Sequence, residues 1–302
     1  MRATSSISVA VLALAVVGTQ VPSAAQPDLL APMRAAMGGD ATLTSIQTLS
    51  IEGSESSSGA GGQSIQVRMA LPDKFIRVAV QYVDSPLGQE TLTNTHGFNG
   101  TELVGRVEGP RGLELPAYPN LTGSTGAERV ARLKREFDEQ RRRMMSWTLL
   151  LLAGANPNPG FTVTGTSDTT IDGKAVRVLA LARWDGAAMQ LAVDGATNLP
   201  WRLSWKGETP QRYTFTSDSQ VTTRGGTVIS ASKPGEPQLS GTSPGSVGEV
   251  EYSLTVDQYK TDRGLTWPRR LIQTVGGKRS SEVKVSKYVL NPKFGSDAFS
   301  AR

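Results

Sequence analysis

The chain has 302 residues, of which 38% are hydrophobic, with a formal net charge of +5, one histidine and no cysteine. The lack of cysteine excludes disulfide bonds, thiolate chemistry and a lipid-anchored cysteine, so stability must come from a hydrophobic core. The basic residues form no stripe with interleaved aromatic residues, so no nucleic-acid partner is indicated. The mild positive charge suits an anionic membrane surface or an acidic ligand.

The first 25 residues are typical of a signal peptide. Arg2 precedes an apolar run from Ile7 to Gly18, and small residues follow up to Ala25. This run is shorter than the roughly 20 residues that a membrane-spanning helix needs. We therefore expect export to the periplasm, with cleavage after about Ala25 and a mature chain of residues 26–302.

Residues 26–302 are expected to form a single domain, because no composition change is strong enough to divide them. Helical spacing from Pro27 to Met37 predicts a short helix that ends at Gly38-Gly39, and Asp40 is expected to cap a second one running to Ile46. Two segments rich in Gly, Ser or Pro, 53–64 and 231–248, predict flexible loops.

Strands are indicated where apolar and polar side chains alternate with a period of two. One-sided alternation of this kind favours an antiparallel sheet with one solvated face. Asn-Gly and Asp-Gly pairs predict tight hairpins between such segments. The clearest strand segments are 63–69, 75–80, 199–205 and 250–256, and the turn pairs lie at 99–100, 172–173, 185–186 and 194–195.

One long helix is predicted from about Gly126 to Gly154. Its first part is charged and contains the triplet Arg141, Arg142 and Arg143, whereas residues 144–153 are almost wholly apolar. The apolar part is too short to cross a bilayer, so it must be buried in protein, inserted in a cavity or covered by a ligand. For the arginine triplet, a membrane, an acidic partner and solvent all remain open, solvent being the usual answer.

No catalytic or metal-binding pattern is found. His96, the only histidine, lies beside the Asn99-Gly100 turn, where an ordinary structural role is expected. The one Gly-x-Ser-x-Gly match, at 241–245, has no helix predicted after it and no later histidine, so it does not predict a nucleophile elbow. We expect no enzyme activity, no catalytic residues, no metal site and no cofactor.

The apolar helix end and the strand face that carries Trp201 and Trp205 provide two large apolar surfaces. Most such residues simply form a core. The alternative is that part of the surface lines a pocket for an acyl chain. The candidate ligand-binding residues on these surfaces are Met144, Trp147, Leu150, Leu151, Trp201, Leu203, Trp205 and Tyr252.

Four passages together resemble the LolA/LolB-like superfamily of periplasmic lipoprotein carriers and related outer-membrane lipoprotein-sorting proteins. They are AAMGGDATLTSIQTLSIEG from Ala35, GFNGTELV from Gly97, VDGATNLPWRLSW from Val193 and YVLNPKFGSDAF from Tyr288. The resemblance is one of pattern and extends over nearly all of residues 26–302. It implies a mainly β fold with helices (α+β), in which a strongly curved antiparallel sheet forms a half-open barrel covered by helices. It also implies an apolar cavity for acyl chains, with residues 144–153 as a lid or plug.

Our first expectation is a non-enzymatic periplasmic binding or carrier protein for a lipid, an acyl chain or a lipidated protein, in transient contact with a membrane or an envelope protein. The alternative is an exported protein-interaction or envelope-sensing module of the same fold without a ligand cavity. Packing distinguishes the two, because the module would have a core filled to a density of about 0.74.

Overall fold

The computed structural model describes residues 28–57, 60–85, 88–109, 114–116, 125–155, 160–208, 214–216, 240–242 and 248–300. The predicted signal peptide and its cleavage site lie outside these ranges, as does most of the predicted loop at 231–248. No helix in the described part of the chain has the length and apolar character needed to span a membrane.

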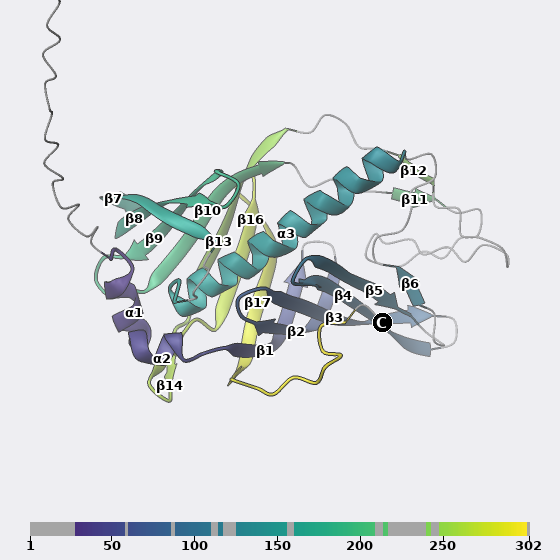
Figure 1. Cartoon of the computed structure of the whole chain (residues 1–302), viewed down its shortest axis with the longest axis horizontal. Helices are drawn as coiled ribbons and strands as arrows, with labels where there is room; N and C mark the ends of the chain where they lie inside the picture. The colour runs from purple at the N-terminus through teal and green to yellow at the C-terminus, as the bar shows by residue number, and fades with distance from the viewer. Residues whose placement is uncertain are drawn as a thin grey trace, which may run out of the picture.

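The body of the molecule is one antiparallel sheet of 13 strands (Figure 1). Their order across the sheet is β6 (Glu114–Pro116), β5 (Glu102–Glu108), β4 (Gly88–Asn99), β3 (Lys74–Ser85), β2 (Ala60–Ala70), β1 (Thr48–Ser57), β17 (Lys278–Leu290), β16 (Arg270–Val275), β13 (Glu249–Asp257), β10 (Pro200–Glu208), β9 (Ala188–Asp194), β8 (Lys174–Arg183) and β7 (Phe161–Ile171). Two short pairs stand apart from it: β11 (Thr214–Thr216) with β12 (Ser240–Thr242), and β14 (Lys260–Asp262) with β15 (Leu265–Trp267).

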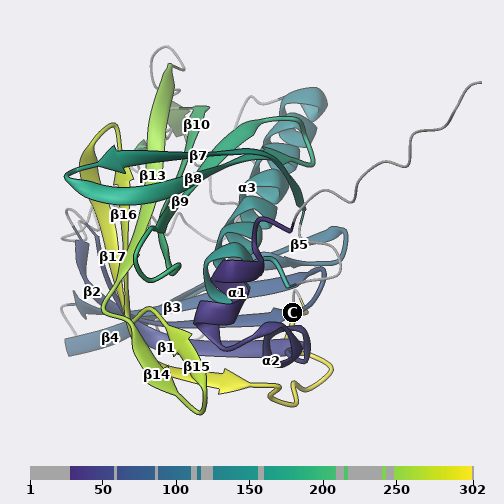
Figure 2. The same cartoon turned by 90° about the vertical axis from the view of Figure 1, so that its left-hand side faces the viewer.

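The sheet consists of two halves of neighbouring antiparallel strands joined at its middle. Strands β1 to β6 form one half, and β7 to β10 continue through β13 and β16 to β17 in the other, where β17 pairs with β1. The outermost strands, β6 and β7, do not pair with each other, so the sheet stays open. Figure 2 shows it curving around the helices. The expected mainly β fold, a curved half-open antiparallel sheet with helices, is confirmed.

Three helices accompany the sheet in the described ranges: α1 (Ala31–Met37), α2 (Asp40–Thr44) and α3 (Gly126–Leu152). The predicted long helix is α3. It begins with a capping box, in which Thr125 Oγ1 accepts from the Glu128 backbone N–H and the Glu128 carboxylate accepts from the Thr125 N–H. The first helix starts later than predicted, and Gly39 rather than Asp40 is the N-cap of α2.

The predicted hairpins also form. Asp172 and Gly173 both have positive φ angles, 52° and 78°, and connect β7 to β8 as a tight turn requires. Asp194 instead stabilises a longer connection to β10, because its carboxylate accepts hydrogen bonds from the backbone N–H groups of Ala196 (2.8 Å) and Thr197 (2.9 Å).

The prediction of a loop over 53–64 is wrong for the residues described there. Residues 53–57 continue β1 and 60–64 belong to β2, with Gly53 opposite Ile65 and Ser57 opposite Ala60. The segment lacks apolar anchors, but β1 pairs with β17 on its other side, so ladder hydrogen bonds on both sides supply the order.

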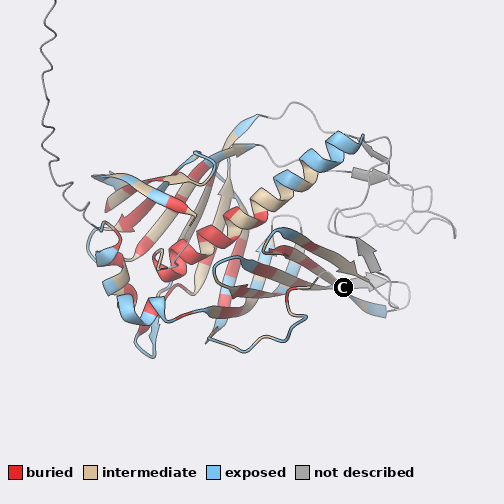
Figure 3. Cartoon of the chain, viewed as in Figure 1, coloured by how far each residue is buried: buried red, intermediate tan, exposed pale blue. Residues whose placement is uncertain are grey.

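The core lies between the concave face of the sheet and the apolar half of α3, which is buried while the amino-terminal half is exposed (Figure 3). Leu149 to Leu152 are all 0% exposed and share one cluster with Met33 and Met37 of α1. Of the three environments open to residues 144–153, burial in protein is therefore the observed one.

Candidate functional site

A pocket of about 230 Å³ lies between the middle of α3 and the concave face of the sheet. Seven strands of the large sheet and α3 contribute to it, so residues far apart in the sequence meet there. Its lining residues are Glu55, Ile65, Phe75, Arg77, Glu139, Arg142, Arg143, Ser146, Trp147, Trp205, Leu254, Leu271, Gln273, Ser281 and Val283.

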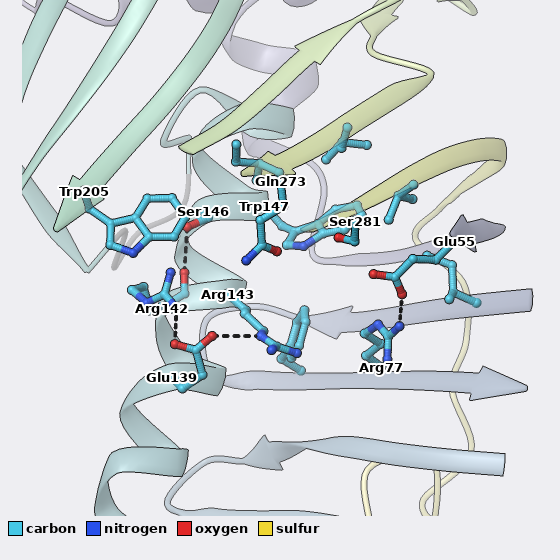
Figure 4. Close-up of a pocket in the computed structure, with 15 residues that line it drawn as sticks. Glu55, Arg77, Glu139, Arg142, Arg143, Ser146, Trp147, Trp205, Gln273 and Ser281 are labelled. Atoms are coloured by element: carbon cyan, nitrogen blue, oxygen red, sulfur yellow. Dashed lines mark hydrogen bonds and ion pairs between the residues drawn. The ribbon is translucent and has the colours of Figure 1, made fainter. Parts of the chain in front are cut away.

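The wall that α3 provides comes from the junction between its charged and its apolar half. Glu139, Arg142, Arg143, Ser146 and Trp147 recur at intervals of three and four residues, which places them on one face of the helix. The α3 wall of the pocket therefore carries its charges at Glu139, Arg142 and Arg143 and continues with Ser146 and Trp147 towards the carboxyl-terminal half of the helix (Figure 4).

Glu139 is the centre of the charge network on α3. Its Oε1 accepts a hydrogen bond from Arg143 Nε at 3.0 Å, and its Oε2 accepts from Arg142 Nη2. Burial acts to raise the pKa of Glu139, but the two guanidinium groups outweigh it and the net pKa is lowered. The carboxylate is therefore ionised at neutral pH.

Arg142 is held by aromatic rings as well as by Glu139. Its guanidinium lies 4.4 Å from the centre of the Trp205 ring and 5.7 Å from that of Tyr252. The two rings are stacked, with centroids 5.6 Å apart and planes 4° from parallel. Cation–π contacts of this kind hold Arg142 against β10 and β13.

A second ion pair, between Arg77 of β3 and Glu55 of β1, lies on the sheet side of the pocket (Figure 4). Burial lowers the pKa of Arg77, which Glu55 only partly offsets. His96 stands opposite Arg77 in the β3–β4 ladder, and burial together with the charges of Arg143 and Arg77 lowers its pKa to about 4. His96 is therefore neutral near pH 7.

Two of the eight candidate ligand-binding residues, Trp147 and Trp205, line the pocket. The others do not reach it. Met144, Leu150, Leu151, Leu203 and Tyr252 are buried in the core beside it, with at most 9% of their surface exposed.

Trp201 lies outside the core cluster. The pairing of β9 with β10 shifts between Pro200 and Arg202, and this irregularity interrupts the alternation that placed Trp201 on the same face as Leu203 and Trp205. Its ring instead contacts two cations, with the Lys174 ammonium at 5.3 Å and the Arg202 guanidinium at 4.5 Å from its centroid.

The charged residues of the pocket were absent from the predicted site, although part of the signal is present in the sequence. Glu139, Arg142 and Arg143 have the helical spacing of ion pairs immediately before the apolar run. Arg77 follows Phe75 by two residues, so a strand places both on one face. Among the described residues, no three His, Asp or Glu side chains gather as a metal ion would require.

A second hollow, of about 560 Å³, lies on the opposite face of β1 to β5 and beneath residues 292–300. Phe299 anchors this carboxyl-terminal segment by packing on Ile76 and Val104. The basic residues Arg68, Arg106 and Lys293 are matched there by three acidic ones, Glu52, Glu108 and Asp297. We take the concave pocket as the candidate site, because its charged side chains are the more deeply buried.

No family model and no curated protein sequence matches the chain. Among solved structures, it is similar to a domain from Vibrio parahaemolyticus whose name proposes outer membrane lipoprotein sorting (12% identity, 88% of this chain and 92% of that chain, TM-score 0.40). It is also similar to a DUF1329 family protein from Desulfovibrio piger, with 10% identity over 86% of this chain and 92% of that chain and a TM-score of 0.41. A third similar structure is a LolA superfamily protein from Nitrosomonas europaea, with 11% identity over 89% of this chain and 97% of that chain and a TM-score of 0.38. Likeness at this level says nothing of what the chain binds.

Proposed function

We propose that this protein is a non-enzymatic binding or carrier protein for an amphiphilic ligand, namely a lipid, an acyl chain or a lipidated protein. The observation that carries the proposal is the pocket beneath α3, whose lining combines apolar side chains with two partly buried ion pairs. The amino-terminal pattern of residues 1–25 supports export to the periplasm as the setting.

The composition of the walls supports an amphiphile over a purely polar ligand. Ile65 of β2, Leu271 of β16 and Val283 of β17 are apolar residues that line the pocket from the sheet, and Trp147 lines it from α3. Burial of alkyl groups against such a surface is worth about 0.8 kcal/mol for each CH₂ group. The charged side chains then meet the head group of the same ligand.

The size of the pocket limits what can enter it. Ligand pockets usually measure about 300–1,000 Å³, whereas this one measures about 230 Å³. It therefore suits part of one acyl chain with its head group, and a bulkier lipidated protein requires α3 to move outward. Exposure of the amino-terminal half of α3 is compatible with such movement.

The alternative, an exported protein-interaction or envelope-sensing module, is favoured by one observation. Residues 149–152 of α3 are fully buried, so the space expected beneath the apolar helix end is filled. If the pocket in the middle of α3 holds no guest, the fold still presents a rigid sheet with an exposed helix half for a protein partner.

Tryptophan fluorescence tests the proposal directly, because Trp147 and Trp205 line the pocket. Titration of the mature chain with decanoic acid and with a fluorescent fatty-acid probe should give saturable binding and a change in tryptophan emission. The emission change should shrink in the Trp147→Phe variant and persist in Trp201→Phe, since Trp201 lies outside the core cluster.

A variant that fills the pocket provides a second test of the proposed function. Ser281 of β17 lines the pocket, and Ser281→Phe places a ring in its space. We expect this variant to keep its fold by circular dichroism and to lose probe binding. Saturable binding that survives Ser281→Phe unchanged would contradict the assignment of this pocket, and the lack of any binding to the wild type would contradict the carrier function.

A further inference from the structure

We infer that the ligand of this pocket carries an anionic oxygen group, a carboxylate or a phosphate, and that the guanidinium of Arg143 binds it. This inference rests on the proposed function and adds the chemical class of the head group to it. The inference is based on the guanidinium of Arg143, which lines the pocket and has both terminal nitrogens available to donate hydrogen bonds to a ligand.

Arg143 differs from the other two pocket arginines in its exposure and in the nitrogen that binds its glutamate. Its Nε donates to Glu139 Oε1 at 3.0 Å, and its two terminal nitrogens have no hydrogen-bond partner among the described residues. Its side chain is 42% exposed, compared with 11% for Arg142 and 17% for Arg77. Because Arg143 lines the pocket, a ligand there can reach this accessible surface.

Arg142 and Arg77 each use a terminal nitrogen, Nη2, to bind a glutamate. Arg142 is bonded to Glu139 and lies over Trp205, and Arg77 is bonded to Glu55. A ligand that used Nη2 of either residue would have to displace the glutamate already bound there. The terminal nitrogens of Arg143 can bind a ligand while Nε keeps its bond to Glu139.

The charge of the lining favours an anion over a cation. Three arginines line the pocket and two glutamates, Glu55 and Glu139, oppose them. Glu136 also acts on Arg143, but it is not in the lining and its carboxylate accepts from Gln140 Nε2 at 2.7 Å. His96 is the remaining titratable group affected by Arg143 and Arg77, and its neutrality near pH 7 adds no charge.

The geometry of a guanidinium specifies the ligand further. Its planar fork donates two parallel hydrogen bonds to a carboxylate or a phosphate, a fit that an alcohol or an ether oxygen cannot match. Trp147, which follows Arg143 by one helical turn, and Val283 of β17 then contact the adjoining alkyl part. The ligand class is therefore an anionic amphiphile, either a fatty acid or a phosphate-bearing lipid.

Four ligands of equal chain length test the inference: decanoate, decyl phosphate, decanol and decyltrimethylammonium. Isothermal titration of the mature chain should show that at least one anion binds tenfold or more tightly than decanol, and that the cation binds most weakly. Preference for decanoate indicates a fatty acid as the source of the anionic group, and preference for decyl phosphate indicates a phospholipid.

Variants then assign the preference to Arg143. Arg143→Gln should weaken binding of the preferred anion roughly ten- to hundredfold and leave decanol unchanged, because a charge-assisted hydrogen bond is lost. Arg143→Lys keeps the charge without the fork and should fall in between. Arg141→Gln is the matched control, since Arg141 lies over Trp184, at 4.5 Å from the ring centroid, and does not line the pocket.

The outcomes separate this inference from the proposed function. Equal binding of all four ligands to the wild type would overturn the inference and leave the carrier function intact. Binding of none would overturn the carrier function itself. If Arg143→Gln proves unfolded by circular dichroism, binding of the four ligands to the wild type and to Arg143→Lys still tests whether Arg143 binds the anionic group.

Discussion

The indole Nε1 of Trp267 donates a 2.8 Å hydrogen bond to the carbonyl oxygen of Leu151 in the last turn of α3. Carbonyl groups in the last turn of a helix have no partner within the helix, so this bond satisfies one of them in the core. Trp267 is itself 4% exposed and packs on the Tyr288 ring with a centroid distance of 4.5 Å. The apolar end of α3 is thereby fixed to β15 and β17.

Replacement of Trp267 by phenylalanine should therefore destabilise the fold. The change removes the bond to Leu151 and leaves a space beside Tyr288, and we expect the free energy of unfolding to fall by about 2 to 4 kcal/mol. Urea denaturation followed by circular dichroism measures it. Trp201→Phe is the control and should cost less than about 1 kcal/mol, because Trp201 is outside the core cluster. Equal losses in the two variants would contradict the prediction.

Gly53 is expected to tolerate no side chain, although it lies in a polar segment. A β-carbon added there would be 2.2 Å from the carbonyl oxygen of Lys284, at the point where the β1–β17 register shifts. Gly53→Ala should lower the free energy of unfolding by about 1 to 3 kcal/mol, through displacement of the backbone at the joint between the two halves of the sheet.

Gly62, on the facing strand of the same hairpin, is the matched control. No atom lies within 4 Å of an added β-carbon at Gly62. Gly62→Ala should be neutral or raise the free energy of unfolding by up to about 1 kcal/mol, since alanine loses less backbone entropy on folding. Thermal unfolding of both variants under the same conditions checks the pair, and a similar fall in both would show that the close approach at Gly53 has no energetic effect.

The local elements could be predicted from the sequence because each depends on neighbouring residues. Alternation around Val67 and Tyr252 identified strands, and the change from charged to apolar residues identified α3. The pairing of β1 with β17 could not be predicted in this way, because Leu49 and Leu290 meet across nearly the whole chain. Trp201 was misplaced for a related reason, since the register shift beside it depends on how β9 pairs with β10.

The charged part of the site could not be predicted from the sequence, because it too depends on contacts between residues that are far apart in the chain. Arg77 shares a face with Phe75, but its partner Glu55 lies in the segment that the composition assigned to a loop. The inward position of Arg142 depends on its contact with Trp205, a residue of β10 that comes much later in the sequence. The search for a cavity considered apolar residues alone, whereas many of these fill the core and the pocket is lined by charged as well as apolar side chains.

Glu139 and Arg142 should be energetically coupled. Arg142→Met keeps the alkyl contact with Trp205 but removes the charge, and Glu139→Gln leaves both arginines without their carboxylate. We expect each single change to cost about 1 to 3 kcal/mol. Because each removes the same ion pair, the double variant should cost less than the sum of the two, with a coupling of about 1 to 2 kcal/mol.

Urea denaturation of the four members of this double-mutant cycle measures the coupling. The corresponding cycle for the exposed pair Lys134 and Asp138, four residues apart on the same helix, is the comparison and should give about 0.5 kcal/mol or less. Coupling of the inner pair no larger than that of the outer pair would mean that solvent screens the pocket network.

The pH dependence of stability between pH 4 and 6.5 should depend on His96. Burial, with the charges of Arg143 and Arg77, lowers the pKa of His96 to about 4 in the folded protein, whereas the unfolded chain has a histidine pKa near 6.5. The unfolded chain therefore binds more protons in this interval, and stability rises with pH. The contribution of neutral His96 is complete above about pH 6.5 and is lost as the pH falls towards 4.

Because His96 is the only histidine, its ring protons give a single titrating signal in an NMR spectrum, and the midpoint should lie well below 6. The free energy of unfolding of the wild type should fall by about 2 kcal/mol between pH 7 and pH 5 relative to the His96→Gln variant, which has no group that titrates there. Most carboxylates complete their ionisation below this range and affect both proteins alike. A midpoint near 6.5, or parallel pH profiles for the two proteins, would mean that the ring is hydrated and remote from the pocket arginines, and would remove His96 from the electrostatic account of the site.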